Sequence, residues 1–219
     1  MLFGPTYGYS NRGPKKMAQQ ADVVPNELKE VGVDENFGGQ VDLATPFVNE
    51  EGREVVLSQF FDGRRPIILS FVYYNCPNLC GLYLDGLVDA LRKVDLNVGK
   101  EFDIVVISVD PNETPKMAMD KKNHYVTSYN RPESRKGWHF LTGSQESIAK
   151  IANQVGFKYK WDEGIKQWIH ASAGMVLTPK GKISFYHYDI AFDPKTIRLS
   201  LIDASAERIG KLIDHALLF

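Results

Sequence analysis

The chain carries two cysteines, Cys76 and Cys80, and both lie in one short segment with three residues between them. The apolar run before them predicts a buried strand and the pattern after them predicts a helix. The pair is therefore expected at a helix N-terminus, where N–H groups and the helix dipole favour anions and lower the pKa of a thiol. Two such thiols fit a disulfide switch, a soft-metal site, or both. Two inert, buried cysteines are the alternative.

His170 is the residue that could add a third donor to the two sulfurs. Thiol oxidoreductases of the thioredoxin type carry Cys-x-x-Cys and a cis-proline before a later strand. Here the spacer is one residue longer, and His170 precedes the strand expected at 173–177. Two thiolates and an imidazole suit copper, although a histidine taken alone is more often an ordinary hydrogen-bonded residue. The remaining histidines are expected at the surface or the edge of the core: His124, His139, His187 and His215.

The other patterns predict the elements that must position these side chains. Leucines and valines at three- and four-residue spacing after the cysteines indicate a helix. Proline in the first turn marks a second helix, and Ser144 or Ser147 with Gly156 bound a third. The predicted order is a β-hairpin at 46–57, a strand at 67–74, the cysteine helix to about 94, a strand at 102–109, a helix at 114–128, a strand at 138–141, a helix at 144–155, strands at 173–177 and 183–188, and a helix at 193–212. This order predicts one α/β domain with a mixed sheet.

Composition excludes several other classes of protein. The 219 residues suffice for one sizeable core, and a net charge of −1 without a long basic block argues against nucleic acid as a partner. No apolar run approaches the roughly 20 residues of a membrane-spanning helix. The first residues do not form a secretory signal, so the chain is either cytosolic or trimmed of its targeting segment. We expect an N-terminal arm with little regular structure at 1–40, a folded domain at 41–215, and a truncated C-terminal tail at 216–219.

Four motifs, in the same order, resemble those of the Sco/SenC proteins, which assemble cytochrome c oxidase. Residues 71–80, FVYYNCPNLC, look like the copper motif of that family, and residues 108–115, SVDPNETP, resemble its Asp-Pro-x-x-Asp-Thr-Pro stretch. Residues 137–143, GWHFLTG, resemble its Trp-x-x-Leu-x-Gly strand. His170, followed by PKG at 179–181, is similar to its metal histidine and the hairpin turn that follows. The resemblance covers about residues 40 to 210.

The resemblance implies a thioredoxin-like fold, a mixed central sheet flanked by helices with an N-terminal β-hairpin. It implies copper, as Cu(I) or Cu(II), bound by Cys76, Cys80 and His170. It also implies an exported protein on the periplasmic or intermembrane-space side, with a membrane tether outside this chain. The implied partners are a cytochrome c oxidase subunit or another copper acceptor, and a copper-donor chaperone. Two positions depart from the family pattern: Ile169 replaces an aspartate that often precedes the histidine, and Gly81 replaces a proline that often follows the second cysteine.

Two functions of different classes fit these residues. A copper metallochaperone would hold one ion on three ligands, which leaves a position open for a sulfur of a CuA-type acceptor. A thiol–disulfide reductase would use Cys76 and Cys80 as a catalytic redox pair that reduces the cysteines of the acceptor. Structural zinc normally needs four protein ligands, and a peroxidase would need a separate resolving cysteine. Asp110 is expected either to face the site or a partner as an acid, or to cap the end of a strand.

Overall fold

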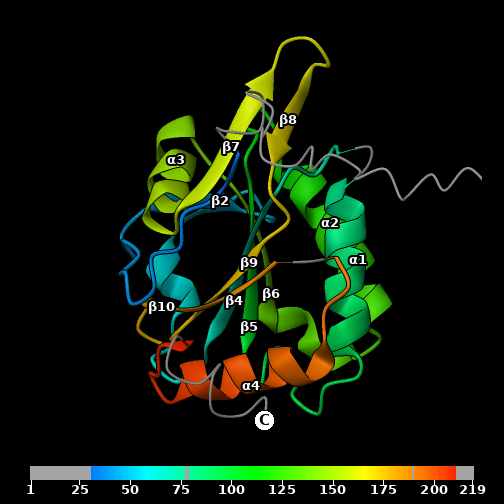
Figure 1. Ribbon diagram of the computed structural model, residues 1–219. Helices are drawn as coiled ribbons and strands as arrows, with labels where there is room; N and C mark the ends of the chain where they lie inside the picture. The colour runs from blue at the N-terminus through cyan, green and yellow to red at the C-terminus, as the bar shows by residue number, and fades with distance from the viewer. Residues whose placement is uncertain (1–30, 77–78, 189, 211–219) are drawn as a thin grey trace, which may run out of the picture.

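The structure, a computed structural model, describes residues 31–76, 79–188 and 190–210, with the backbone alone at 79–80. These residues form a mixed main sheet and a smaller sheet beside it (Figure 1). The main sheet has the strand order β10-β9-β4-β5-β6-β2-β3, and the smaller has the order β1-β7-β8. The strands are β1 Gly32–Val33, β2 Pro46–Asn49, β3 Glu54–Val56, β4 Ile67–Val72, β5 Asp103–Ser108, β6 Trp138–Thr142, β7 Phe157–Asp162, β8 Gln167–His170, β9 Gly174–Leu177 and β10 Ile183–His187.

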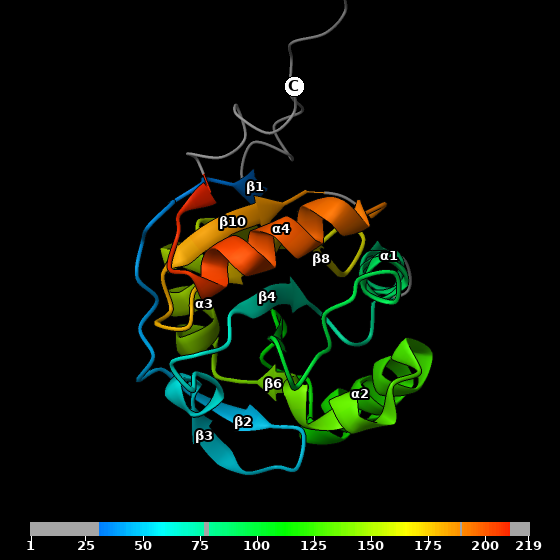
Figure 2. The same cartoon turned by 90° about the horizontal axis from the view of Figure 1, so that it is seen from below.

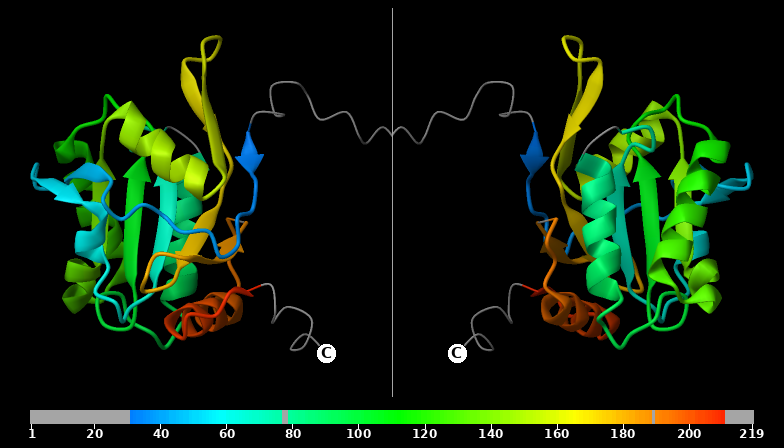
Figure 3. Two further views of the ribbon diagram at one scale, coloured as in Figure 1. Left: turned by 90° about the vertical axis from the view of Figure 1, so that its left-hand side faces the viewer. Right: turned by 90° about the vertical axis from the view of Figure 1, so that its right-hand side faces the viewer.

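Helices cover both faces of the main sheet. Helices α1 and α2 lie on one face and α3 on the other, while α4 crosses one end of the sheet and contacts β9 and β10 (Figures 1 and 3). Seen from that end, α4 lies in front of β10, the strand at one edge of the main sheet (Figure 2). The helices are α1 Leu79–Leu91, α2 Pro115–Tyr129, α3 Gln145–Gln154 and α4 Pro194–Ser205, with short 3-10 turns at Leu57–Phe60 and Pro132–Gly137.

The centre of the main sheet consists of three parallel strands, β4, β5 and β6. Every residue of β4 and of β5 is buried, because helices or strands cover both faces of these strands. This explains why their sequences are nearly continuous apolar runs, and why the sequence predicts them well. Because they are parallel, β4 and β5 end at the same edge of the sheet, and the cysteine segment follows β4 at this edge.

The predicted fold class is confirmed, and most predicted elements appear close to their expected positions. Ser144 caps α3 by accepting a hydrogen bond from the N–H of Ser147, which lies within the helix. Gly156 follows α3 with a φ of +69°, a conformation that favours glycine. In the part of the chain described, no helix is long and apolar enough to cross a membrane.

Two predictions of secondary structure need correction. The last helix ends at Ser205 and not near residue 212, because the chain turns back there: the N–H of Arg208 bonds to the carbonyl of Asp203, and Glu207 has a φ of +58°. The antiparallel strands β7 and β8 were not predicted at all. Most of the expected arm, residues 1–30, and the expected tail, 216–219, lie outside the described residues, but β1 lies within the arm and pairs with β7.

Two histidines, His187 in the core and the half-buried His139, should make the stability of the fold depend on pH. Burial lowers the pKa of His139 and of His187 to about 4; Lys122 and Arg65 also lower that of His139, and Glu50 opposes them. The Nε2 atom of His187 contacts the Ser200 hydroxyl at 2.9 Å. Both rings are therefore neutral in the fold at pH values where an unfolded histidine, with a pKa of about 6.5, already binds a proton.

We expect the free energy of unfolding to be highest above pH 6.5 and to decrease as the pH falls towards 4. Between pH 7.5 and 5.0 the loss should be about 2 to 4 kcal/mol for the two histidines together. Urea unfolding at both pH values measures it. His187→Asn should flatten the dependence, whereas His124→Asn, which changes an exposed residue of α2, should leave it unchanged. Asp103, whose pKa burial raises to about 6, acts in the opposite direction. A pH dependence that is the same in His187→Asn as in the unmodified protein would therefore contradict this account.

Candidate metal centre

The cysteine segment joins the carboxyl end of β4 to the N-terminus of α1. Cys76 is half-buried, and its N–H donates to the carbonyl of Tyr73 at 3.3 Å, which forms a turn directly after the strand. The backbone of Cys80 lies in the first turn of α1, as predicted, whereas its side chain lies outside the described structure. Cys76 thus lies just before a helix N-terminus, where the N–H groups of the first turn favour a thiolate.

His170 ends β8, on the second strand of the hairpin that sequence analysis missed. Its ring packs edge-on against Tyr73, with ring centroids 6.1 Å apart, and lies 5.8 Å from the ring of Phe157. Phe157, at the start of β7, stacks on Phe71 of β4 at 4.9 Å. These aromatic contacts anchor the base of the hairpin beside the end of β4. The structure therefore places the ring of His170 against Tyr73, three residues before Cys76 in the chain.

The surroundings of His170 determine which form its imidazole takes. The Nδ1 atom lies 2.9 Å from the carbonyl oxygen of Ala171. A carbonyl can only accept, so Nδ1 carries the proton and the lone pair of the neutral ring is on Nε2. Burial lowers the pKa of His170, although the hydrogen bond to Ala171 opposes that shift. A neutral ring that donates one N–H to a carbonyl is the usual state of a metal-binding histidine.

Among the described side chains, no group of three or more Cys, His, Asp and Glu is close enough together to hold a metal ion. That set includes Cys76 and His170 but not the side chain of Cys80. The donors themselves fit copper: thiolate sulfur is soft, and imidazole is a common partner for it. A three-ligand site with Cys80 therefore remains a prediction about these residues.

The remaining histidines and acids lie where their ordinary roles place them. His124 is exposed on α2. His139, in β6, packs against Phe60, and His187 is buried in β10, while His215 lies outside the described residues. The carboxylate of Asp110 accepts from the N–H and the side-chain amide of Asn112 at 2.9 and 3.0 Å. Asp110 therefore caps the turn after β5, the local role considered for it.

One carboxylate beside the cysteine segment was not singled out from the sequence. Glu113, in the turn between β5 and α2, accepts hydrogen bonds from the N–H groups of Tyr74 and Asn75, both at 2.6 Å. It is buried, and burial raises its pKa against the effect of these hydrogen bonds. The only sequence signal was its position in the motif SVDPNETP.

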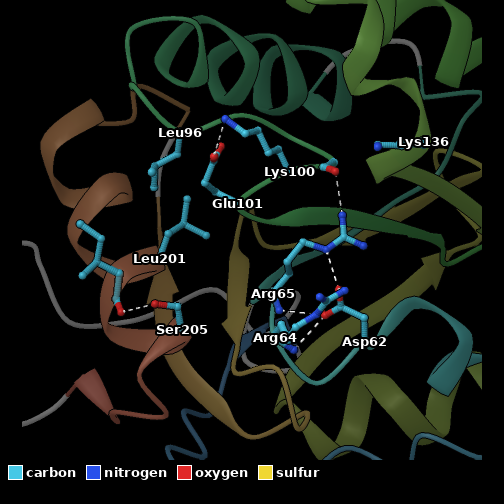
Figure 4. Close-up of a pocket in the computed structure, with 11 residues that line it drawn as sticks. Asp62, Arg64, Arg65, Leu96, Lys100, Glu101, Lys136, Leu201 and Ser205 are labelled. Atoms are coloured by element: carbon cyan, nitrogen blue, oxygen red, sulfur yellow. Dashed lines mark hydrogen bonds and ion pairs between the residues drawn. The ribbon is translucent and has the colours of Figure 1, made fainter.

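One pocket lies at the opposite edge of the sheet and is separate from this centre. It has a volume of about 620 Å³ and lies at the amino ends of β4, β5 and β6, where Figure 4 shows its lining. Arg65 there is paired with Asp62 and with Asp103, and Lys100 with Glu101. The residues that line this pocket include neither cysteine nor histidine, so the pocket is not a candidate for a site with thiolate and imidazole ligands.

A smaller groove of about 460 Å³ between α1 and α2 adjoins the cysteine segment at Tyr74, Asn75 and Gly81.

Both the sequence and the fold of this chain match those of known proteins. The family model described as SCO1/SenC matches residues 35–201. Comparison with curated protein sequences finds no match. The structure of BsSco, a member of the Sco family of cytochrome c oxidase assembly proteins in which a disulfide switch was identified, is 26% identical with a TM-score of 0.60, covering 79% of this chain and 97% of that chain.

Two further solved structures share the fold at lower identity. Arabidopsis thaliana ScoI, determined with copper bound, is 22% identical with a TM-score of 0.60, covering 78% of this chain and 99% of that chain. A protein from Aquifex aeolicus VF5, described as a candidate electron transfer protein, is 22% identical with a TM-score of 0.69, covering 82% of this chain and all of that chain. The fold is thioredoxin-like, as in the Sco structures. Because the family model matches most of the sequence, this chain belongs to the SCO1/SenC family.

Proposed function

We propose that this protein is a copper metallochaperone that binds one copper ion, as Cu(I) or Cu(II), through Cys76, Cys80 and His170. The observation that carries the proposal is the placement of His170, whose neutral ring packs on Tyr73 at the turn leading to Cys76. Its proton is on Nδ1, so Nε2 is the atom that would bind the metal. Membership of the SCO1/SenC family supports this assignment, as does the likeness to ScoI with copper bound.

Three ligands, from the loop after β4, the first turn of α1 and the end of β8, suit an ion that is to be passed on. Such a site leaves a coordination position at which a sulfur of the acceptor can attack, and the ion can then move by ligand exchange without leaving protein donors. We propose a cytochrome c oxidase subunit with a CuA-type centre, or another copper protein, as the acceptor, and a copper-donor chaperone as the source. Residues 41–215 would form the domain that carries the site, on the periplasmic or intermembrane-space side, with a membrane tether outside this chain.

A second function, reduction of the acceptor's cysteines, is favoured by one specific observation. BsSco, which shares 26% identity with this chain, has a disulfide switch. In this reaction a thiolate of Cys76 or Cys80 would attack the acceptor's disulfide to form a mixed disulfide. The other cysteine would then release the reduced acceptor as the pair becomes oxidised. The two functions use the same sulfurs but differ in their need for His170.

Copper titration tests the first function. The reduced protein should bind one equivalent of copper, with binding followed by absorption for Cu(II) and by competition with a chromogenic chelator for Cu(I). The loaded protein should then transfer its ion to the copper-free, reduced CuA domain of a cytochrome c oxidase, measured as the copper content of each protein after the two are separated. A protein that binds less than half an equivalent, or that keeps its copper in the presence of the reduced acceptor, would refute the metallochaperone assignment.

A further inference from the structure

The contacts of Glu113 join the loops that follow two neighbouring strands. Its side chain lies in the turn after β5 and is only 7% exposed. One carboxylate oxygen accepts from the N–H of Tyr74 and the other from the N–H of Asn75, each at 2.6 Å. The hydroxyl of Ser108 donates to the first oxygen at 2.5 Å. A single side chain thus holds the segment after β4, where the cysteines lie, against the end of β5.

The chemical nature of these contacts suits a role in holding the backbone. A carboxylate loses much of its hydration on burial, and this loss is offset only where hydrogen bonds satisfy its oxygens. All three donors to Glu113 are neutral, and two of them are consecutive main-chain N–H groups. An apolar side chain could fill the same space but would leave both N–H groups without this acceptor. The carboxylate therefore fixes the orientation of two successive peptide groups.

Those two peptide groups lie between the residue that contacts His170 and the residue that carries the sulfur. Tyr73, immediately before them, provides the ring against which His170 packs. Cys76, immediately after them, carries the sulfur, and its N–H closes the turn by bonding to the carbonyl of Tyr73. The orientation of the peptides at Tyr74 and Asn75 thus sets where the Cys76 side chain lies relative to the imidazole.

We infer that Glu113 is a positioning residue, which holds the cysteine segment in the conformation that presents Cys76 beside His170. The inference rests on the proposed copper function and deepens it. Glu113 itself is not a copper ligand in this account; it acts through the backbone of residues 74 and 75.

The test compares three variants of the whole protein. Glu113→Gln keeps the size of the side chain but places an NH2 group against one of the main-chain N–H donors. We expect it to weaken copper binding at least about tenfold, the effect of one lost hydrogen bond to a charged group. Glu113→Asp keeps both oxygens on a shorter side chain and should lie between Glu113→Gln and the unmodified protein. Ser108→Ala is the matched control, because it removes the third donor and leaves both main-chain contacts; its affinity should change less than about threefold.

A second readout separates positioning from stability and from copper binding. In the reduced, copper-free protein, the rate at which Cys76 is alkylated, resolved by mass spectrometry, should change in Glu113→Gln and remain unchanged in Ser108→Ala. A lower melting temperature with normal affinity and normal alkylation would show a merely structural role and overturn the inference. If Glu113→Gln does not fold, Glu113→Asp decides by the same two measurements. If the unmodified protein binds no copper, the proposed function fails, while the alkylation rates still decide the role of Glu113.

Discussion

Replacing His170 with alanine should reduce copper affinity more than about 100-fold while leaving thiol–disulfide exchange in place. Losing an outer hydrogen-bond partner of a metal ligand already costs roughly 10- to 100-fold, and loss of the ligand itself should cost more. Exchange at Cys76 and Cys80 needs only the sulfurs, so its rate should stay within a few-fold of the original. Chelator competition measures the first quantity, and reduction of a mixed-disulfide substrate measures the second.

The controls for this prediction come from the same chain. His124→Ala removes an exposed imidazole from α2 and should change neither copper affinity nor exchange. Cys76→Ser should abolish both, because it removes a proposed ligand and one of the two redox sulfurs. Unchanged copper affinity in His170→Ala would mean that the two sulfurs suffice. The function would then shift towards thiol reduction, with copper as a secondary ligand.

The sequence predicts the central sheet well because local patterns carry the necessary information. The strands β4 and β5 are buried on both faces, and such strands are short, apolar and rich in β-branched residues whatever their neighbours are. Ser144 and Gly156 mark the ends of α3 by their own backbone chemistry. The location of Cys76 after β4 follows from the same local reading. These features depend on few residues that lie close together in the chain.

The missed hairpin shows a different limit. In β7 the aromatic residues Phe157, Tyr159 and Trp161 alternate with charged residues, which is the signal of a strand with one apolar face. That signal was available, but the strands lie outside the main sheet, where the order of elements gave no reason to expect them. Without the hairpin, His170 could be placed only before β9. Its contact with Tyr73 depends on the aromatic packing of Phe157 on Phe71, which requires the tertiary structure.

The role of Glu113 could not be predicted by any local pattern. Its partners Tyr74 and Asn75 are 39 and 38 residues away in the chain, and they contribute main-chain N–H groups that every non-proline residue possesses. Nothing in the identity of residues 74 and 75 therefore points to a carboxylate partner. The contact arises from the parallel pairing of β4 with β5, which brings the carboxyl ends of the two strands, and so Glu113 and these N–H groups, close together.

Breaking the buried ion pair between α2 and the β2–β3 turn should cause a large loss of stability. Lys122 of α2 and Glu50 of the β2–β3 turn form an ion pair, with side chains 10% and 6% exposed. Glu50 also accepts from the N–H of Phe140 in β6 at 3.2 Å. Lys122→Met would leave this carboxylate buried without its cation, so we expect the free energy of unfolding to fall by about 3 to 5 kcal/mol. Urea unfolding at pH 7.5 measures the loss.

Two further variants show that the unpaired charge causes this loss. The double variant Glu50→Gln with Lys122→Met removes both charges but keeps an acceptor for the N–H of Phe140, so it should recover most of the stability. Lys116→Met breaks an exposed pair with Asp120 on the same helix and should change the free energy of unfolding by less than about 0.5 kcal/mol. A loss below 1 kcal/mol in Lys122→Met would show that water reaches Glu50 and hydrates its charge. Although α2 also lines the groove beside the cysteine segment, Lys116, Lys122 and Glu50 are not among the groove residues. Copper affinity, measured at a temperature well below the unfolding transition, should therefore remain normal in every one of these variants.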